Sequence, residues 1–185
     1  MILAEGRYAD LVIRTQQELP RKLAAYEALI KLSYPQVLGL ALGITGDHDA
    51  ASSVAQDVSI RVLHSVRKLQ DPEKYQIWVR RITINVARSW LAKERREVRK
   101  RERYGLEPER NIAPETESPS FTELVTFLTE SERTVVSLKI LEDREFSEIA
   151  EITGMSLSAA KMRYYRSLEK IKVGLAQANE DVNVS

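Results

Sequence analysis

The chain has 185 residues, of which 30% are charged, and its formal net charge at pH 7 is only +1. That length suits one domain of ordinary size or two small ones, and the net charge gives no bulk-charge argument for nucleic-acid binding. Because cysteine is absent, disulfide frameworks, thiolate metal sites and cysteine nucleophiles are excluded. Any nucleic-acid signal must therefore lie in how the charges are distributed along the chain.

Two helices are predicted in the first 45 residues. The first runs from Leu3 to Glu18 and suggests no function, and the N-terminus lacks the basic start and unbroken apolar run of a secretory signal. The second runs from Arg21 to Ile44, where Pro35 should kink or split it and Gly43 and Gly46 should end it. No stretch is expected to span a bilayer, which favours a soluble cytoplasmic protein.

The third predicted helix is AASSVAQDVSIRVLHSVRKL, and Asp49 is a plausible N-cap for it. Its buried stripe is predicted to be Ala51, Ala55, Val58, Val62, Val66 and Leu69. An aliphatic Ile60 on the opposite, polar face indicates either a contact with another protein or one stray exposed residue, and the residues alone favour the second.

The fourth predicted helix is WVRRITINVARSWLAKERREVRKRER, which follows a loop at Asp71-Pro72 and contains no Pro or Gly. Its first half should face a core with Trp78, Val79, Ile82, Val86 and Trp90. A second row holds Arg81, Asn85 and Arg88 and continues to Arg95 and Arg99. After Leu91 the apolar stripe fades, so this basic end is expected to leave its domain. Arginine and aromatic groups together are typical of sites that hold unstacked bases, and a solvated helix end with local ion pairs is the alternative.

The C-terminal third begins after a predicted flexible acidic linker at 105–120, GLEPERNIAPETESPS, which contains three prolines. Two helices joined by a capping box, TESE, are predicted next. A short helix from about Ser147, a turn at Gly154 and a longer helix capped by Ser156 then predict a helix-turn-helix, with a plain three-helix bundle as the alternative. The core side of the last helix is predicted to carry Leu157, Ala160, Tyr164, Leu168 and Ile171.

In this order the motifs resemble an extracytoplasmic-function (ECF, group IV) sigma factor of the sigma-70 family of bacterial RNA polymerase. The matching pieces are DHDAASSVAQDVSIRVLHSV, YQIWVRRITINVARSWLAKERR and FLTESERTVVSLKILEDREFSEIAEITGMSLSAAKMRYYRSLEKI. The resemblance implies an all-α fold with two small helical domains, a region 2 bundle and a region 4 helix-turn-helix, joined by a flexible linker. The expected divisions are an N-terminal helix at 1–20, region 2 at 21–104, the linker at 105–120, region 4 at 121–178 and a tail at 179–185.

The resemblance also implies partners and roles. Core RNA polymerase would be bound through its β′ clamp and β flap. Ile60 then becomes an expected contact with the polymerase. The full set of expected core-polymerase contacts is Ser53, Gln56, Asp57 and Ile60. The resemblance implies that region 2 recognises and melts the minus-10 promoter element through Tyr75, Trp78, Arg81, Asn85, Arg88, Lys93, Arg95 and Arg96. The Asn85 amide would lie beside a flipped-out base of the non-template strand. Region 4 would bind the minus-35 element through Ser158, Lys161, Met162, Arg163 and Arg166.

Enzyme chemistry is not expected. Asp47-His48-Asp49 could in principle hold a cation, but a helix N-terminus enriched in Asp explains the same residues, and no cofactor, metal or small-molecule substrate is expected. An anti-sigma factor is an expected partner. The residues leave two alternatives open, a regulator that binds duplex DNA without polymerase and a decoy that occupies polymerase or an anti-sigma factor.

Overall fold

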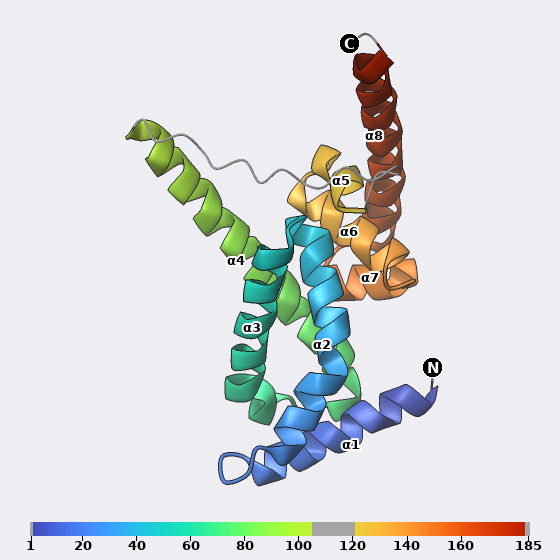
Figure 1. Cartoon of the computed structure of the whole chain (residues 1–185). Coiled ribbons are helices and arrows are strands. Elements are labelled where there is room, and N and C mark those ends of the chain that lie inside the picture. The colour runs from blue at the N-terminus through green and yellow to red at the C-terminus, as the bar shows by residue number, and fades with distance from the viewer. Residues whose placement is uncertain (1, 105–120, 184–185) are drawn as a thin grey trace.

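Helices make up the whole regular structure of residues 2–104 and 121–183, which are the residues that a computed structural model of the protein describes. The predicted all-α class is confirmed, with no strand in those two ranges (Figure 1). The predicted linker and the end of the predicted tail lie outside the described residues. The N-terminal bundle consists of α1 (Ile2–Glu18), α2 (Ala24–Thr45), α3 (His48–Ser65), the 3-10 turns η1 (Val66–Lys68) and η2 (Pro72–Lys74), and α4 (Tyr75–Arg103). The C-terminal bundle consists of α5 (Phe121–Leu124), the 3-10 turn η3 (Val125–Phe127), α6 (Glu130–Ile140), α7 (Phe146–Thr153) and α8 (Leu157–Asn183).

Helix α2 is the central helix of the N-terminal bundle, and it packs against α1, α3, α4 and α6. Its side chains Leu29, Leu40 and Ile44 are fully buried. By length and composition alone α2 could cross a membrane, which corrects the expectation that no such stretch exists. A helix that is contacted on several sides within a protein is as apolar as a membrane-spanning helix, because most of its faces lie in a core.

The ends of α2 and α3 differ from the sequence expectation. Helix α2 continues through Pro35 without a split, and it ends at Gly46, whose φ of 75° is left-handed. Gly43 does not end the helix but lies buried inside it. Asp47, rather than Asp49, caps α3, because its extended backbone lets Oδ1 accept a hydrogen bond from the amide of Ala50 at 2.7 Å.

Helix α4 is the predicted single long helix, and its two halves differ as expected. The first half is held in the core by Val79, Ile84 and Val86, while Trp78 and Trp90 pack partly buried against the same cluster. The second half projects away from the bundle (Figure 1). Most of its residues from Lys93 onward are exposed, since the apolar stripe ends near Leu91.

The helix-turn-helix is formed by α7 and α8, and its local signals are confirmed. Gly154 has a left-handed φ of 73°, and the Ser156 hydroxyl accepts a hydrogen bond from the amide of Ala159 at 3.2 Å. The predicted capping box begins α6, where Thr129 and Glu132 bond each other's backbone. Leu157 is 46% exposed, which corrects its predicted core position, because the first residue of α8 lies beyond the packed face.

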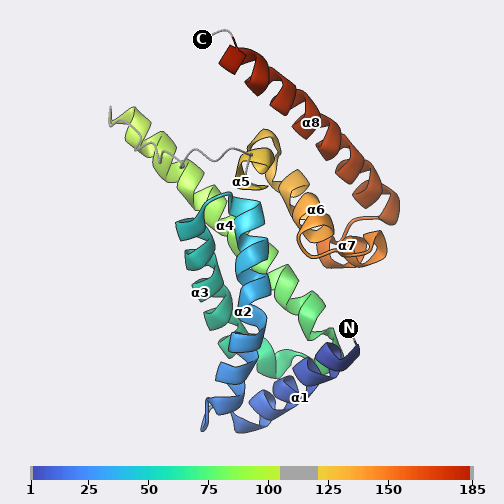
Figure 2. The same cartoon turned by 45° about the vertical axis from the view of Figure 1, so that its right-hand side comes forward.

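The two bundles pack against each other, in what we call the closed arrangement. Figures 1 and 2 show α6 beside α2, and α7 lies against α4. Residues of both bundles share one buried cluster, to which the C-terminal bundle contributes Val135, Leu138, Ile149, Ile152 and Ala160. The approach is close at Gly43, where an added Cβ would lie 2.8 Å from the Cβ of Ser137. Gly43 therefore allows α6 to contact the backbone of α2 directly.

A buried ion pair also joins the bundles. Arg80 Nε of α4 donates to Glu142 Oε2 at 2.5 Å, and the two side chains are 3% and 9% exposed. The remaining guanidinium nitrogens of Arg80 donate to the Gln76 carbonyl at 2.9 Å and to Gln36 Oε1 at 3.1 Å. Because the charge is paired and its donors are satisfied, burial of Arg80 is compatible with the fold.

Candidate nucleic-acid interface

The predicted row Arg81, Asn85 and Arg88 lies along one face of α4. Together with Ile152, Thr153 and Gly154 of the helix-turn-helix, these residues line a cavity of about 220 Å³. Arg81 and Asn85 are exposed, and Arg88 is half-buried. The structure therefore brings the three predicted residues together, and it places the turn of the second bundle opposite them.

In the closed arrangement the arginines of this face are bound by the C-terminal bundle. Arg81 Nη2 donates to the Glu151 carbonyl at 2.7 Å. Glu130 at the start of α6 contacts two of the arginines, with Oε1 3.1 Å from Arg88 Nε and Oε2 2.9 Å from Arg95 Nη2. A carboxylate and a phosphate bind guanidinium groups in the same way. A phosphate that binds Arg88 through Nε or Arg95 through Nη2 therefore competes with Glu130 for the same nitrogen.

The loop before α4 forms one wall of a second cavity, of about 430 Å³. The lining residues are Lys68, Leu69, Gln70, Asp71, Lys74, Ile77, Trp78, Arg81 and Glu151. The cavity thus combines an aromatic ring, amide and carboxylate groups, and cations from the loop and from the exposed side of α4. Such a combination suits a planar, polar group of nucleobase type.

Tyr75 is a core residue, which corrects its prediction as a DNA contact. It is 0% exposed, its ring stacks on Tyr8 at a centroid distance of 5.6 Å, and its hydroxyl lies 3.2 Å from the hydroxyl of Ser33. Burial raises the pKa of Tyr75 well above its ordinary value. Tyr75 therefore anchors the start of α4, whereas its neighbour Trp78 reaches the cavity. The other predicted residues of this set, Lys93, Arg95 and Arg96, are exposed on the projecting end of α4.

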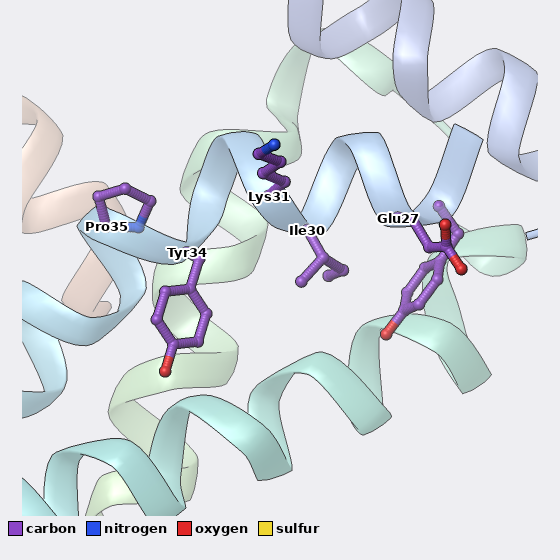
Figure 3. A pocket seen from close by; sticks show the side chains of 6 residues that line it. Glu27, Ile30, Lys31, Tyr34 and Pro35 are labelled. Atoms are coloured by element: carbon purple, nitrogen blue, oxygen red, sulfur yellow. The ribbon is translucent and has the colours of Figure 1, made fainter. Parts of the chain in front are cut away.

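The predicted polymerase contacts lie on one exposed face of α3. Ser53, Gln56, Asp57 and Ile60 recur at helical spacing, and all four are exposed, with Ile60 at 53%. An apolar groove of about 360 Å³ on α2 is lined by Tyr26, Glu27, Ile30, Lys31, Tyr34 and Pro35. Figure 3 shows Ile30 and Tyr34 extending from α2 toward α3, with Lys31 on the other side. Tyr26 donates a hydrogen bond to the Ser59 carbonyl of α3 at 2.9 Å, so the groove borders the α3 face.

The predicted minus-35 residues lie on the outer side of the helix-turn-helix. Ser158, Lys161, Met162 and Arg166 are exposed on α8. Arg163 is partly buried, and its Nη1 lies 3.3 Å from Met155 Sδ. Arg163, Met162 and Arg166 line one side of a hollow of about 350 Å³ whose other side includes Glu132.

Glu132 connects α6 to α8 through its contact with Lys170, and the C-terminal bundle is therefore expected to lose stability in acid. Burial by itself would raise its pKa, but hydrogen bonds from Lys170 at 2.6 Å and from Thr129 outweigh this effect and hold the pKa below its ordinary value. Its contribution to stability is therefore full above the pKa of an unfolded glutamate, about 4.3, and is lost as the pH falls through the lower folded pKa.

We predict that Glu132→Gln flattens the acid dependence of stability below about pH 4.3, because glutamine preserves the capping box but does not titrate. Urea unfolding followed by circular dichroism at several pH values measures the free energy of unfolding. Glu169→Gln removes an exposed carboxylate of the same helix as Lys170, and it should retain the acid dependence of the wild type. Equal acid dependence in Glu132→Gln and the wild type would contradict the prediction.

Family models match both halves of the chain, Sigma-70 region 2 over residues 29–97 and Sigma-70, region 4 over residues 120–171. The two matches together cover more than half of the sequence. The chain belongs to the ECF group of the sigma-70 family. The region 2 match spans most of α2 through most of α4, and the region 4 match spans α5 through the first half of α8. Helix α1 precedes both matches.

Curated relatives of this sigma factor are distant in sequence. The probable RNA polymerase sigma factor RfaY of Xanthomonas campestris is 26% identical over 174 residues, which cover 86% of this chain and 44% of RfaY. This chain therefore spans less than half the length of that relative. Sigma factor SigV of Bacillus subtilis is 26% identical, with 75% of this chain and 83% of SigV covered. Sigma factor CarQ of Myxococcus xanthus is 25% identical, with 85% and 93% covered.

Two solved structures have the same fold. CnrH, solved in complex with the cytosolic domain of CnrY, has a TM-score of 0.67 at 17% identity, covering 92% of this chain and 97% of CnrH. RpoE of Bartonella quintana, solved with the anti-sigma factor NepR, has a TM-score of 0.67 at 20% identity, covering 82% and 96%. The TM-scores support the shared fold, and at such low identities the roles of individual residues are argued from this chain alone.

Sequence reasoning missed three residues that organise this sigma factor. Arg80 was overlooked because it adjoins the exposed Arg81, and its partner Glu142 is 62 positions away. Glycine is typical of helix ends, so the sequence predicts an end at Gly43, and Gln16 lies in a helix for which the sequence suggests no function. A signal existed only for Arg80, because a position next to Val79 on the apolar side of an amphipathic helix indicates a buried or paired charge.

Proposed function

We propose that this sigma factor binds core RNA polymerase, directs it to specific promoters and helps to melt the minus-10 element. It performs no bond chemistry, acts in the cytoplasm, and uses residues 21–104 as region 2 and residues 121–178 as region 4. The single observation that carries the proposal is the row Arg81, Asn85 and Arg88 on α4, which lies beside a cavity that contains Trp78. Guanidinium groups beside an aromatic pocket are suited to unpaired DNA.

In region 2 the chemistry of each side chain indicates its proposed role in DNA binding. The Asn85 amide can both donate and accept, so it can read the edge of an unpaired base. Arg81 and Arg88 neutralise backbone phosphates, and Lys93, Arg95 and Arg96 extend the positive charge along the projecting end of α4. Trp78 offers its ring to a base that has left the duplex stack.

The α3 face is the proposed docking surface for the β′ clamp of core polymerase. Ile60 lies on the same side as Asp57 and Gln56, so an apolar contact is surrounded by polar groups that orient the partner. The apolar groove of Ile30 and Tyr34 borders this face and enlarges it (Figure 3). Removal of this apolar area from water would stabilise the complex.

Region 4 is proposed to place α8 in the major groove of the minus-35 element and to contact the β flap. Lys161, Met162 and Arg166 are exposed on the second helix of the helix-turn-helix, which is the helix that reads base edges in this motif. Ser158 near the start of α8 and the partly buried Arg163 complete the set. Arginine can bind guanine by two hydrogen bonds, which gives this surface sequence selectivity.

An anti-sigma factor is the proposed regulator. The structural neighbour RpoE was solved with the anti-sigma factor NepR, and CnrH was solved with the cytosolic domain of CnrY. The exposed Ile60 and the basic end of α4 are surfaces of this chain that such a partner would cover. Co-purification from the native cell under uninduced conditions tests the proposal, and recovery of the chain without a partner would contradict it.

We predict that Asn85→Ala and Arg88→Ala each lower promoter-dependent transcription by about 10-fold to 100-fold, since each removes about 1–3 kcal/mol of DNA contact energy. Run-off transcription with core polymerase of the same organism measures the effect. Arg7→Ala changes an exposed arginine of α1 and should leave transcription unchanged.

Two binding measurements separate the alternatives. A decoy would start no transcription and would bind core polymerase or an anti-sigma factor equally well after both substitutions, and a self-sufficient regulator would bind its duplex site equally well without polymerase. Cognate core polymerase that neither binds the wild-type chain nor starts transcription with it would overturn the proposed function.

A further inference from the structure

Helix α1 holds the loop that precedes α4, although it lies outside both segments that match the family models. The Gln16 Nε2 group donates to the Val66 carbonyl at 2.9 Å and to the Leu69 carbonyl at 2.8 Å. These partners are 50 and 53 positions away in the sequence. One amide therefore uses both of its N–H groups to fix the two ends of a single short turn.

The turn that Gln16 holds is the point where the chain leaves α3 and enters the cavity wall. Val66 begins the 3-10 turn η1, and Leu69 follows its end with an extended ψ of 110°. Leu69 and its neighbours Lys68 and Gln70 all line the cavity of about 430 Å³ that contains Trp78. A shift of the Leu69 carbonyl therefore moves two polar cavity residues relative to α4.

Helix α1 fixes the other wall of the same cavity as well. Tyr8 stacks on Tyr75, whose ring lies 5.9 Å from that of Trp78 at an angle of 44°. The Tyr8 hydroxyl donates to the Leu32 carbonyl of α2 at 3.2 Å, which ties α1 to the central helix. Helix α1 therefore contacts both the loop and the aromatic start of α4, and it positions them relative to each other.

We propose that Gln16 is a positioning residue for base recognition at the minus-10 element and acts through the Val66–Leu69 turn. The inference rests on the proposed function, because it assigns the loop cavity to an unpaired promoter base. Gln16 itself does not contact DNA. Without its two hydrogen bonds the turn gains freedom, and the polar groups of Lys68 and Gln70 no longer keep the hydrogen-bonding distances and angles that discriminate bases.

The first test needs no polymerase. Gln16→Met keeps the length of the side chain but cannot donate a hydrogen bond, and Gln17→Met makes the same change at the exposed next position. Hydrogen exchange of the Leu69 and Lys74 amides should be about 10-fold faster in Gln16→Met than in Gln17→Met, as expected when carbonyl groups lose their donor. Equal exchange in the two variants would overturn the role of Gln16 in ordering the loop.

The second test measures recognition in the reconstituted holoenzyme with cognate core polymerase. Open-complex formation is compared on a promoter and on single-base variants of its minus-10 element, and affinity for core polymerase is measured in parallel. Gln16→Met should reduce the discrimination between bases at one minus-10 position by about 10-fold, with core affinity and minus-35 dependence unchanged. A purely structural defect would instead lower core affinity and all promoters together, and that result would overturn the inference.

Two further variants make the test specific. Gln16→Glu places a carboxylate against two carbonyl oxygens and should reduce discrimination further than Gln16→Met. Gln16→Lys restores N–H donors and should recover part of it. If the wild-type holoenzyme starts transcription but Gln16→Met equals Gln17→Met, only this inference fails. If the wild type itself gives no promoter-dependent starts, the proposed function fails.

Discussion

Replacement of Arg80 by methionine is expected to separate region 4 from region 2 while region 2 stays folded. The substitution removes the buried partner of Glu142 and the donors to Gln36 and Gln76. A buried carboxylate that loses its partner costs about 3–5 kcal/mol. Arg144 remains 3.6 Å from Glu142, which favours the lower end of that range. The chain can avoid this cost by exposing Glu142 to water, and that requires the closed arrangement to open.

Opening can be measured as an increase in the radius of gyration by small-angle scattering. Energy transfer between two dyes gives a second measurement, because the chain has no native cysteine and introduced thiols at Asp10 and Glu169 would be labelled without background. Arg99→Met is the matched control, since Arg99 is an exposed arginine on the projecting end of the same helix, and it should change the closed arrangement by less than about 1 kcal/mol. An unchanged radius in Arg80→Met, or loss of helical signal from region 2, would contradict the prediction.

Gly43→Val is expected to open the same interface by a steric route. A Cβ at this position would lie 2.8 Å from the Cβ of Ser137 and 3.2 Å from Leu141 Cδ1, so α6 must move away from α2. Overpacking of this kind costs about 1–3 kcal/mol, and the two extra methyl groups of valine favour the upper end. The displacement acts on the contacts that α6 makes through Arg133, which donates to the Thr45 carbonyl at 3.3 Å.

Gly39 supplies a matched control for this second prediction. It lies one turn earlier in α2, and a Cβ added there meets nothing within 4 Å. Gly39→Val makes the same change in helix propensity and in chain entropy, so the difference between the two variants reports the interface alone. Gly43→Val should increase the radius of gyration and the accessibility of Arg88 and Arg95 to oligonucleotide, and Gly39→Val should change neither. Equal behaviour of the two variants would show that α6 does not depend on the glycine.

Whether the arginines of α4 are free to bind DNA depends on which arrangement the protein adopts. In the closed arrangement Glu130 contacts both Arg88 and Arg95, and the Glu151 carbonyl accepts a hydrogen bond from Arg81. A row of arginines has the same sequence pattern whether it faces a phosphate or a carboxylate, because both ligands need the same guanidinium geometry. The pattern therefore predicts a surface that binds anions, but it gave no information about what occupies that surface in the unbound protein.

The sequence by itself determined the helices, most of their caps and the helix-turn-helix, because these depend on residues three or four positions apart. The capping box at Thr129, the positive φ of Gly154 and the single long α4 are examples. Errors occurred where two local signals compete over a few residues, as with Asp47 and Asp49 at the start of α3. Leu157 was misplaced because helical periodicity does not show where a packed face ends.

Only the tertiary structure decided which residues meet across long separations. Tyr75 precedes an exposed row of arginines, yet the packing of α1 buries it. Glu142 lies 62 positions from Arg80, Ser137 lies 94 positions from Gly43, and Val66 lies 50 positions from Gln16. Hydrogen bonds, ion pairs and steric contacts act over a few ångströms in space. Their identity is therefore fixed by how the helices pack, and no spacing pattern within one helix contains it.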